Sequence, residues 1–280
     1  MVIDSLVDLP PFFKTSLPVK VVGFKVYVNG KEYTDGKNIK KEEFYRLAES
    51  TDDLRTSYPP PEETLTLYRE LEEQGVDEIL AVHLPAKVSG FLSSLNQVLD
   101  KVKAKVKVFD SKSLSAGAGF VAAKLIELFE KGASFRDLEE RFWDIRRRLH
   151  LQFGVPSLKF LIKNGRIGKA RGMIGTLLNI LPVLTVDEDG EVAPMSKVRG
   201  ERKLFDKMVQ NVLNFVKDRE KIEMIVGWGA ESARKNAMKL KEMIFGEIGD
   251  KIVNYGEIRI SPTVGCHAGP GVFGIAVYAL

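Results

Sequence analysis

Strand-like and helix-like patterns of apolar residues alternate through the first 150 residues. Short β-branched or apolar runs predict strands at residues 19–28, 77–82 and 106–109. The first run ends at Asn29-Gly30, a pair that favours a tight hairpin turn. Helical spacing predicts helices at residues 40–49, 62–74, 89–102 and 120–129. Strands that alternate with helices are joined by parallel crossovers, so this half predicts an α/β layer fold with a mostly parallel sheet.

The pattern changes after a predicted helix at residues 136–149. Two β-type runs at 183–186 and 191–198, joined by the turn at 187–190, predict an antiparallel hairpin. Predicted helices and strands then alternate at residues 201–216, 222–228, 231–245 and 257–260. We therefore predict an α/β domain at residues 1–152 and an α+β domain at residues 153–280, with the boundary near Phe153.

Small hydroxyl residues follow the predicted strands of the first half. They lie at residues 4–5, 83–90 and 110–115, and Thr56-Ser57 occupies a predicted polar turn. Ligands of such sheets bind at the carboxyl ends of the strands. Each hydroxyl could serve as an ordinary helix cap. Together they also fit a ring of donors around one anionic or carbonyl group, and Ser89, at a predicted helix start, suits a carboxylate.

The seven residues from Gly265 to Gly271 hold three glycines, a proline and His267, next to an apolar run at 272–278. Glycine permits close backbone approach and proline fixes the chain direction. The stretch predicts a rigid loop that either presents an imidazole at a site or forms a structural turn. Cys266 and His267 are adjacent, and neighbours on an extended segment point apart. We therefore interpret Cys266 as a small buried residue.

Composition is that of a soluble globular protein, with 44% hydrophobic and 29% charged residues and a net charge of +4. We find neither a signal peptide nor an apolar run of ~20 residues, the length that spans a bilayer. A single cysteine excludes an intrachain disulfide framework, which fits a cytoplasmic protein. The charge balance gives no argument for nucleic acid. Residues 159–186 nevertheless carry five basic and no acidic side chains, which fits a solvated face, an anionic ligand or an acidic partner.

Several sequence signatures of enzymes are absent or misplaced. The chain has no Walker loop, no His-Glu-x-x-His helix and no cysteine pair. Its three histidines lie in three regions, and His83 and His150 have no carboxylate at ligand spacing, so we predict no metal site. Gly117-x-Gly119-x-x-Ala122 resembles a dinucleotide fingerprint but does not directly follow the first strand. Close helix packing explains these small residues better.

Seven short motifs span nearly the whole chain. They are Asp4-Ser5-Leu6-Val7-Asp8-Leu9-Pro10, Arg55-Thr56-Ser57-Tyr58-Pro59, Lys87-Val88-Ser89-Gly90, Asp110-Ser111 with Ser115-Ala116-Gly117, Lys163-Asn164-Gly165-Arg166-Ile167-Gly168, Lys197-Val198-Arg199-Gly200, and His267-Ala268-Gly269-Pro270-Gly271. No single motif is specific, but in this order they resemble the DegV family. These are bacterial fatty-acid-binding proteins that include the FakB subunits of fatty acid kinase.

The resemblance implies that one long-chain fatty acid is bound between the two domains and that no cofactor is needed. It implies that the hydroxyls of Thr56 and Ser89 hold the carboxylate, with His267 nearby and Ser57 and Ser115 adjoining. The acyl chain would run into an apolar tunnel to which the second domain contributes. Neutral hydroxyls supply the donors that a buried carboxylate requires.

The resemblance also implies a partner, a separate ATP-dependent kinase that phosphorylates the bound carboxylate to an acyl phosphate. The residues matching Arg166 and Arg199 would belong to the docking or transfer surface. The chain would then be a carrier without catalytic machinery of its own and without stable membrane insertion. The alternative is an autonomous acyl or phosphoryl transferase with His267 as general base. A nucleotide-binding regulator would need a phosphate loop that the sequence lacks.

The chain departs from the family pattern at three positions near the expected headgroup. Pro85-Ala86 stand where the family often has two serines, and Ala268 replaces a threonine. Tyr58 and Pro60 also differ from the residues usual around the Thr-Ser motif. The lost hydroxyls change the hydrogen bonding around the headgroup, which fits an altered ligand choice or the absence of a kinase partner.

Overall fold

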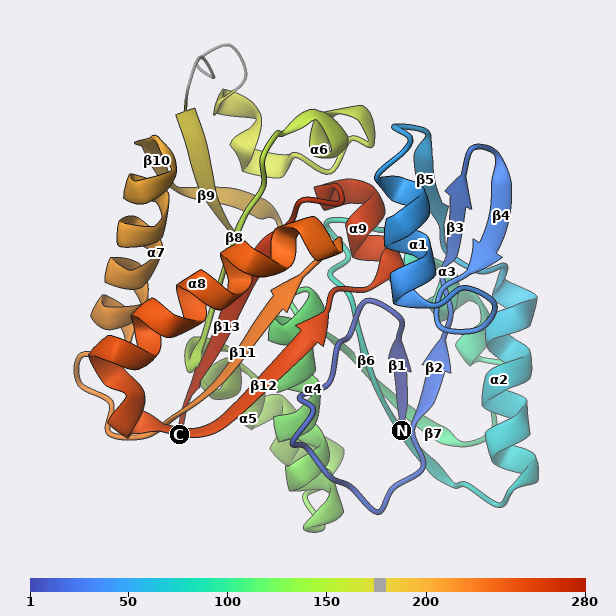
Figure 1. The fold of residues 1–280 in the computed structure, drawn as a ribbon. Coiled ribbons are helices and arrows are strands. Elements are labelled where there is room, and N and C mark those ends of the chain that lie inside the picture. Colours follow the sequence, from blue (N-terminus) through green and yellow to red (C-terminus); the bar gives the residue numbers. More distant parts are fainter. Residues whose placement is uncertain (174–179) are drawn as a thin grey trace.

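The computed structural model describes residues 1–173 and 180–280. In these residues the strands form three sheets, flanked by helices (Figure 1). The predicted α/β fold class is confirmed, with a parallel sheet in the N-terminal half and a mixed sheet in the C-terminal half. Within the described residues, none of the helices combines the length and apolar character needed to cross a membrane.

The N-terminal sheet is parallel and has the strand order β2-β1-β6-β7. Its strands are β1 (Val2–Asp4), β2 (Lys20–Val22), β6 (Glu78–His83) and β7 (Lys105–Asp110). Its helices are α2 (Pro61–Glu73), α3 (Phe91–Leu99), α4 (Ser115–Glu130) and α5 (Phe135–Arg147). Apolar residues of α2 and α3 share one core cluster with this sheet, and those of α4 and α5 share another. The sheet is therefore covered on both faces, as parallel sheets require.

A smaller antiparallel sheet has the order β4-β3-β5 and packs with α1 (Lys41–Ala48). Its strands are β3 (Lys25–Val28), β4 (Lys31–Thr34) and β5 (Leu54–Ser57). The predicted hairpin at Asn29-Gly30 is confirmed, and both residues have the positive φ that its turn needs. The single strand predicted at residues 19–28 was wrong, because the chain leaves the parallel sheet after Val22 and joins the small sheet at Lys25.

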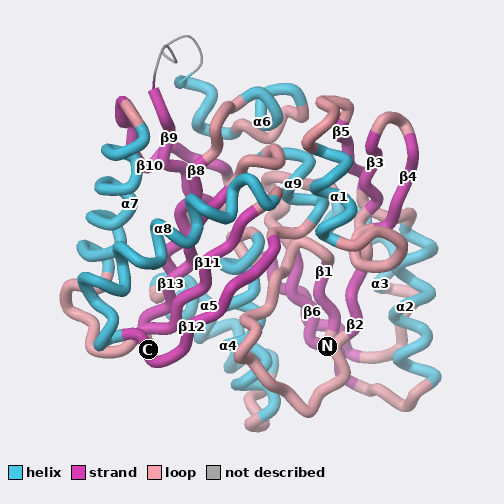
Figure 2. Tube along the Cα trace, in the orientation of Figure 1, coloured by secondary structure: helices cyan, strands magenta, loops and turns pink. Residues whose placement is uncertain are grey.

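The C-terminal sheet is mixed and has the order β10-β9-β8-β13-β11-β12. Its strands are β8 (Leu149–Gly154), β9 (Ile180–Val186), β10 (Val192–Arg199), β11 (Ile222–Trp228), β12 (Ile252–Arg259) and β13 (Phe273–Ala279). Helices α7 (Glu201–Phe215) and α8 (Glu231–Ile248) share a core cluster with one face of it. The predicted β9–β10 hairpin is confirmed. Figure 2 shows the mixture of strands and helices in this half.

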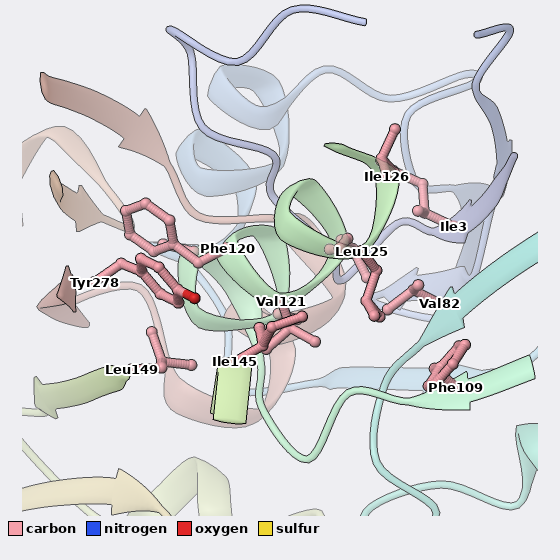
Figure 3. Close-up of a cluster of buried hydrophobic side chains, with 14 of the residues drawn as sticks. Ile3, Val82, Phe109, Phe120, Val121, Leu125, Ile126, Ile145, Leu149 and Tyr278 are labelled. Atoms are coloured by element: carbon pink, nitrogen blue, oxygen red, sulfur yellow. The ribbon is translucent and has the colours of Figure 1, made fainter. Parts of the chain in front are cut away.

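Helix α4 lies between the two large sheets. Its residues Phe120, Val121 and Leu125 belong to a core cluster that includes Ile3 and Val82 from one sheet and residues of the other sheet (Figure 3). Gly119 brings α4 against the backbone of the opening segment, since a Cβ there would lie 1.8 Å from the carbonyl oxygen of Asp8. The predicted role of these small residues in close helix packing is confirmed. The predicted boundary at residues 152 and 153 falls within β8, and the two-domain division stays a prediction.

Four short helices complete the described chain, and the sequence patterns predicted none of them. They are α6 (Lys159–Lys163), α9 (Pro262–Ala268) and the 3-10 turns η1 (Gly168–Met173) and η2 (Gly249–Lys251). The rigid loop predicted from Gly265 to Gly271 was therefore wrong in its first part, because residues 265–268 form the end of α9. The helix ends at Ala268, and the next residue, Gly269, has a φ of 84°, which suits glycine.

Candidate functional site

A cavity of about 240 Å³ lies where α4, α9 and β5 meet the C-terminal sheet. Most of its wall is apolar and comes from both halves of the chain. The apolar lining includes Leu6, Phe24, Leu84 and Leu114 from the first half and Leu151, Phe153, Leu161, Ile225, Ile258 and Ile260 from the second. The polar side chains predicted for the site gather at this cavity, which is lined by Thr56, Ser57, Ser89, Ser115, Arg166 and His267.

His267 and Thr56 form the polar centre of the cavity. The Nε2 atom of His267 lies 2.8 Å from the Oγ1 atom of Thr56. Thr56 belongs to β5, and the polar turn predicted for it was wrong. The two elements are also joined where the thiol of Cys266 contacts the carbonyl of Arg55 at 3.7 Å. The Nδ1 atom of His267 is buried and has no hydrogen-bond partner among the described residues.

Burial, helped by the positive charge of Arg166, lowers the pKa of His267 to about 4. The imidazole is therefore neutral at pH 7 and offers one N–H and one lone pair. A hydroxyl beside a histidine is the geometry of a nucleophile with its base. A general base works best with a pKa near the working pH, and this one lies well below it. The geometry suits a hydrogen-bonding role better than a catalytic one.

Helix α9 is held in place by groups near its N-terminus. Ser261 caps it through the amide of Val264, and Pro262 occupies the first turn. The buried carboxylate of Asp35 accepts hydrogen bonds from the amide and hydroxyl of Thr263, at 3.1 and 2.6 Å. Burial raises the pKa of Asp35 to about 6. A Cβ at Gly265 would lie 2.6 Å from the hydroxyl of Tyr45, so only glycine lets α9 approach α1 this closely.

Ser89 lies on the segment before α3, and its hydroxyl oxygen accepts a hydrogen bond from the amide of Phe91 at 3.2 Å. The N-cap residue of α3 is Gly90, and no side chain caps the helix there. The hydroxyl hydrogen of Ser89 is not used in the contact with Phe91, so it is free to donate to a ligand. Tyr58 closes the neighbouring wall, with its ring 3.4 Å from the Cβ position of Gly90. The sequence showed Tyr58 only as a departure from the family pattern, and its place on the cavity wall was not predicted. Ser57 is exposed, and its hydroxyl lies 3.4 Å from that of Tyr27.

Ser115 lines the cavity, but its hydroxyl donates to Asp8 at 2.7 Å. Asp8 in turn pairs with Lys41 at 2.6 Å, and Lys41 donates to the carbonyl of Arg259. A hydroxyl has one hydrogen, so in this arrangement Ser115 offers the cavity only lone pairs. The contact joins α4 to the opening segment and, through Lys41, to β12.

The two predicted arginines lie in different places. Arg166 lines the cavity and donates to the carbonyls of Val88 and Asn164. It also lines a second, more polar hollow of about 300 Å³ that includes Lys87, Ser89 and Glu191. Arg199 is exposed at the end of β10 and is not among the described residues that line either hollow. The structure therefore brings Arg166 to the predicted site and leaves Arg199 outside it.

Asp4 and His83 form a buried pair at the ends of β1 and β6. The Oδ2 atom of Asp4 accepts from the amide of Leu84 at 2.7 Å and lies 3.2 Å from the Nδ1 atom of His83. Its Oδ1 atom accepts from the amide of Leu6 at 2.9 Å. Asp4 lies 79 residues from His83 in sequence, so a search for carboxylates at ligand spacing could not find this contact. Leu6 and Leu84 both line the cavity, so Asp4 holds two parts of its wall.

Among the described residues, the site has neither a reactive thiol nor a group of side chains that could hold a metal ion. Cys266 is fully buried, as predicted, and burial raises the pKa of its thiol far above the usual range, which makes the thiol unreactive. Within residues 1–173 and 180–280, no group of three or more histidine, cysteine or acidic side chains could hold a metal ion.

The signal that reveals α9 was present in the sequence. Ser261-Pro262 is a serine followed by a proline, which is the pattern of an N-cap and a first helical residue. The glycines that follow it favoured a loop instead. The contacts that offset their low helix propensity, from Asp35 and α1, come from distant parts of the chain.

Known proteins share both the sequence and the fold. The DegV family model matches residues 1–280. A DegV domain-containing protein of Clostridium acetobutylicum is 31% identical over 279 residues, covering 99% of this chain and 97% of that protein. A Thermus thermophilus DegV family protein whose structure is described as showing fatty acid binding is 30% identical, with a TM-score of 0.88, over 100% of this chain and 98% of the other. A Eubacterium eligens DegV family protein loaded with heptadecanoic acid is 21% identical and shares the fold, with a TM-score of 0.80, over 100% and 99% of the two chains. A match over the full length, in sequence and in fold, makes this chain a member of the DegV family.

Proposed function

We propose that the protein binds a long-chain fatty acid, with the carboxylate at Thr56, Ser89 and His267 and the acyl chain along the apolar part of the cavity. The observation that carries the proposal is a single cavity whose walls are mostly apolar and whose polar end holds the Thr56–His267 pair. The fatty acid described for the Thermus thermophilus relative supports it.

Hydrophobic burial supplies most of the affinity in this proposal. Each buried methylene contributes about 0.8 kcal/mol, less the cost of ordering the chain. The headgroup needs donors, because a buried carboxylate without hydrogen bonds is costly. Ser89 and the Thr56–His267 pair provide such donors without an ion pair that would resist release. The pair supplies one hydrogen, from Thr56 when the imidazole donates to its hydroxyl, or from His267 when the hydroxyl donates to Nε2. Arg166 adds a positive charge at the side of the cavity shared with the polar hollow.

We further propose that the bound fatty acid is presented to a separate ATP-dependent kinase, which forms an acyl phosphate. The polar hollow beside Ser89 and Arg166 supports this, because it gives the carboxylate end of the ligand an open polar neighbourhood. Arg199 stays a candidate for the docking surface, since it is exposed. In this proposal the chain is a carrier, and it turns over neither ATP nor an acyl ester by itself.

Thr56→Val and Ser89→Ala are each expected to raise the Kd for palmitate by about ten- to a hundredfold, since each removes one donor from a buried carboxylate. Isothermal titration of delipidated protein measures this directly. Thr66→Val is the matched control, because Thr66 is an exposed residue of α2 whose hydroxyl donates to the carbonyl of Glu62. A Kd for both site variants equal to that of the control would contradict the headgroup assignment.

A further inference from the structure

Two glycines face each other on the cavity floor. Gly227 of β11 pairs with Gly274 of β13, and both line the cavity. On either side, the same row across the sheet continues to Phe153 and Ile258, which also line the cavity. The cavity is therefore deepest at the middle of this row, where two adjacent strands carry no side chain.

The cavity becomes shallower along the strands in the direction away from α9. β13 follows α9 after residues 269–272, so Gly274 lies toward the His267 end. The next row on the same face, roughly 7 Å along the strands, pairs Ile225 with Ala276, and both still line the cavity. The row after it contains Tyr278, which is not among the described residues that line the cavity.

The stacked rings of Tyr278 and Phe120 block the cavity in this direction. The ring of Tyr278 lies 5.7 Å from that of Phe120 on α4, at an interplanar angle of 24°, and Figure 3 shows the two rings side by side. Both residues are almost fully buried. A path along the cavity from Thr56 and His267 therefore crosses the glycine row and reaches Ile225 and Ala276.

The fold itself requires only one of the two glycines. A Cβ at Gly274 would lie 2.6 Å from the carbonyl oxygen of Gln152, so the backbone forbids a side chain there. The nearest neighbours of a Cβ at Gly227 would be the side chains of Ile258 and Ile260, at 3.1 and 3.2 Å, and its φ is not in the left-handed region. These neighbours are side chains rather than backbone. They have to shift by a few tenths of an ångström to admit a Cβ at position 227, which would take volume from the cavity.

We infer that Gly227 opens the passage for the acyl chain over the C-terminal sheet and that Ile225 and Ala276 end it, so that these positions determine which chain lengths the protein accepts. The inference rests on the proposed function and adds to it a specificity for the length of the acyl chain. Each methylene that a blocked passage excludes weakens binding roughly fourfold, so excluding four or more discriminates strongly between long and short chains.

The test measures Kd for saturated fatty acids of twelve, fourteen, sixteen and eighteen carbons with the delipidated full chain. Gly227→Val narrows the passage, so its ratio of Kd for the eighteen-carbon to the twelve-carbon acid should rise at least tenfold over that of the unaltered protein. Ile225→Ala removes side-chain volume at the closed end of the passage. The ratio of its Kd for the eighteen-carbon acid to its Kd for the twelve-carbon acid should therefore fall below that of the unaltered protein. Because the two variants shift the ratio in opposite directions, a general loss of stability cannot imitate the result.

Val226→Ala is the matched control, because Val226 lies on the same strand but packs in the core cluster of α7 and α8 on the opposite face. Its chain-length ratio should equal that of the unaltered protein. Chain-length ratios unchanged in both Gly227→Val and Ile225→Ala would overturn the inference while leaving fatty acid binding intact. An unaltered protein that binds none of the four acids would instead overturn the proposed function.

Discussion

Replacing Asp4 by alanine is expected to lower the free energy of unfolding by about 2 to 6 kcal/mol, the cost of leaving two buried amides without their acceptor. Asp4 is fully buried and is the acceptor for the amides of Leu6 and Leu84, with His83 beside it. Alanine leaves both amides without a partner, and each such group costs about 1 to 3 kcal/mol. Urea denaturation at pH 7 measures the change.

The matched control for this prediction is Asp4→Asn, which keeps one carbonyl oxygen and the same shape. It should lose clearly less stability than Asp4→Ala. Because Leu6 and Leu84 line the cavity, the alanine variant should also bind fatty acid more weakly. Equal stability of Asp4→Ala and the unaltered protein would show that Asp4 does not hold these two segments.

Acidification should destabilise the protein through His267. Its pKa is lowered to about 4 in the folded state, against an ordinary value near 6.5 in the unfolded chain. The unfolded state therefore binds a proton first, and the stability that neutral His267 contributes above pH 6.5 is lost as the pH falls toward 4. For a difference of that size, linkage gives a loss of about 3 kcal/mol relative to His267→Gln, which has no such proton to gain.

The measurement compares urea unfolding of the unaltered protein and His267→Gln at pH 7 and pH 4. The other groups that titrate between pH 4 and pH 7 are common to both proteins, so their contributions to the pH dependence of stability cancel in the comparison. They include His150, whose burial lowers its pKa to about 4, and Asp35, whose raised pKa acts in the opposite direction. His150→Gln should show the same pH effect as His267→Gln but leave fatty acid affinity unchanged, since His150 stacks on Phe215 in α7. A stability difference between unaltered protein and His267→Gln that is equal at both pH values would contradict the buried, neutral assignment.

Local patterns were sufficient to predict the elements that propensity and periodicity govern. The β3–β4 hairpin was predicted because Asn29-Gly30 accepts positive φ, and the α/β alternation was predicted because amphipathic helices separate apolar strands. The split at residues 23 and 24 was not predictable in this way. Phe24 turns from one sheet to the other because Ser5 accepts a hydrogen bond from its amide and its ring packs on Phe91, and both partners are distant in sequence.

The site was predicted as a set of residues but not as a geometry. The family resemblance identified Thr56, Ser89 and His267, and the structure places all three on one cavity. Their supports depend on long-range contacts that no local pattern encodes, such as Asp35 at α9 and Asp4 at Leu84. The contact of Ser115 with Asp8 is of the same kind, because a hydroxyl at a helix start looks identical in sequence whether it faces a ligand or a carboxylate.

Native mass spectrometry of the full chain purified from cells, combined with lipid extraction, is the decisive measurement of fatty acid binding. We expect one acyl ligand per chain, which extraction identifies as a long-chain fatty acid and which returns when palmitate is added to delipidated protein. A protein that carries no acyl ligand and takes up none would contradict this expectation.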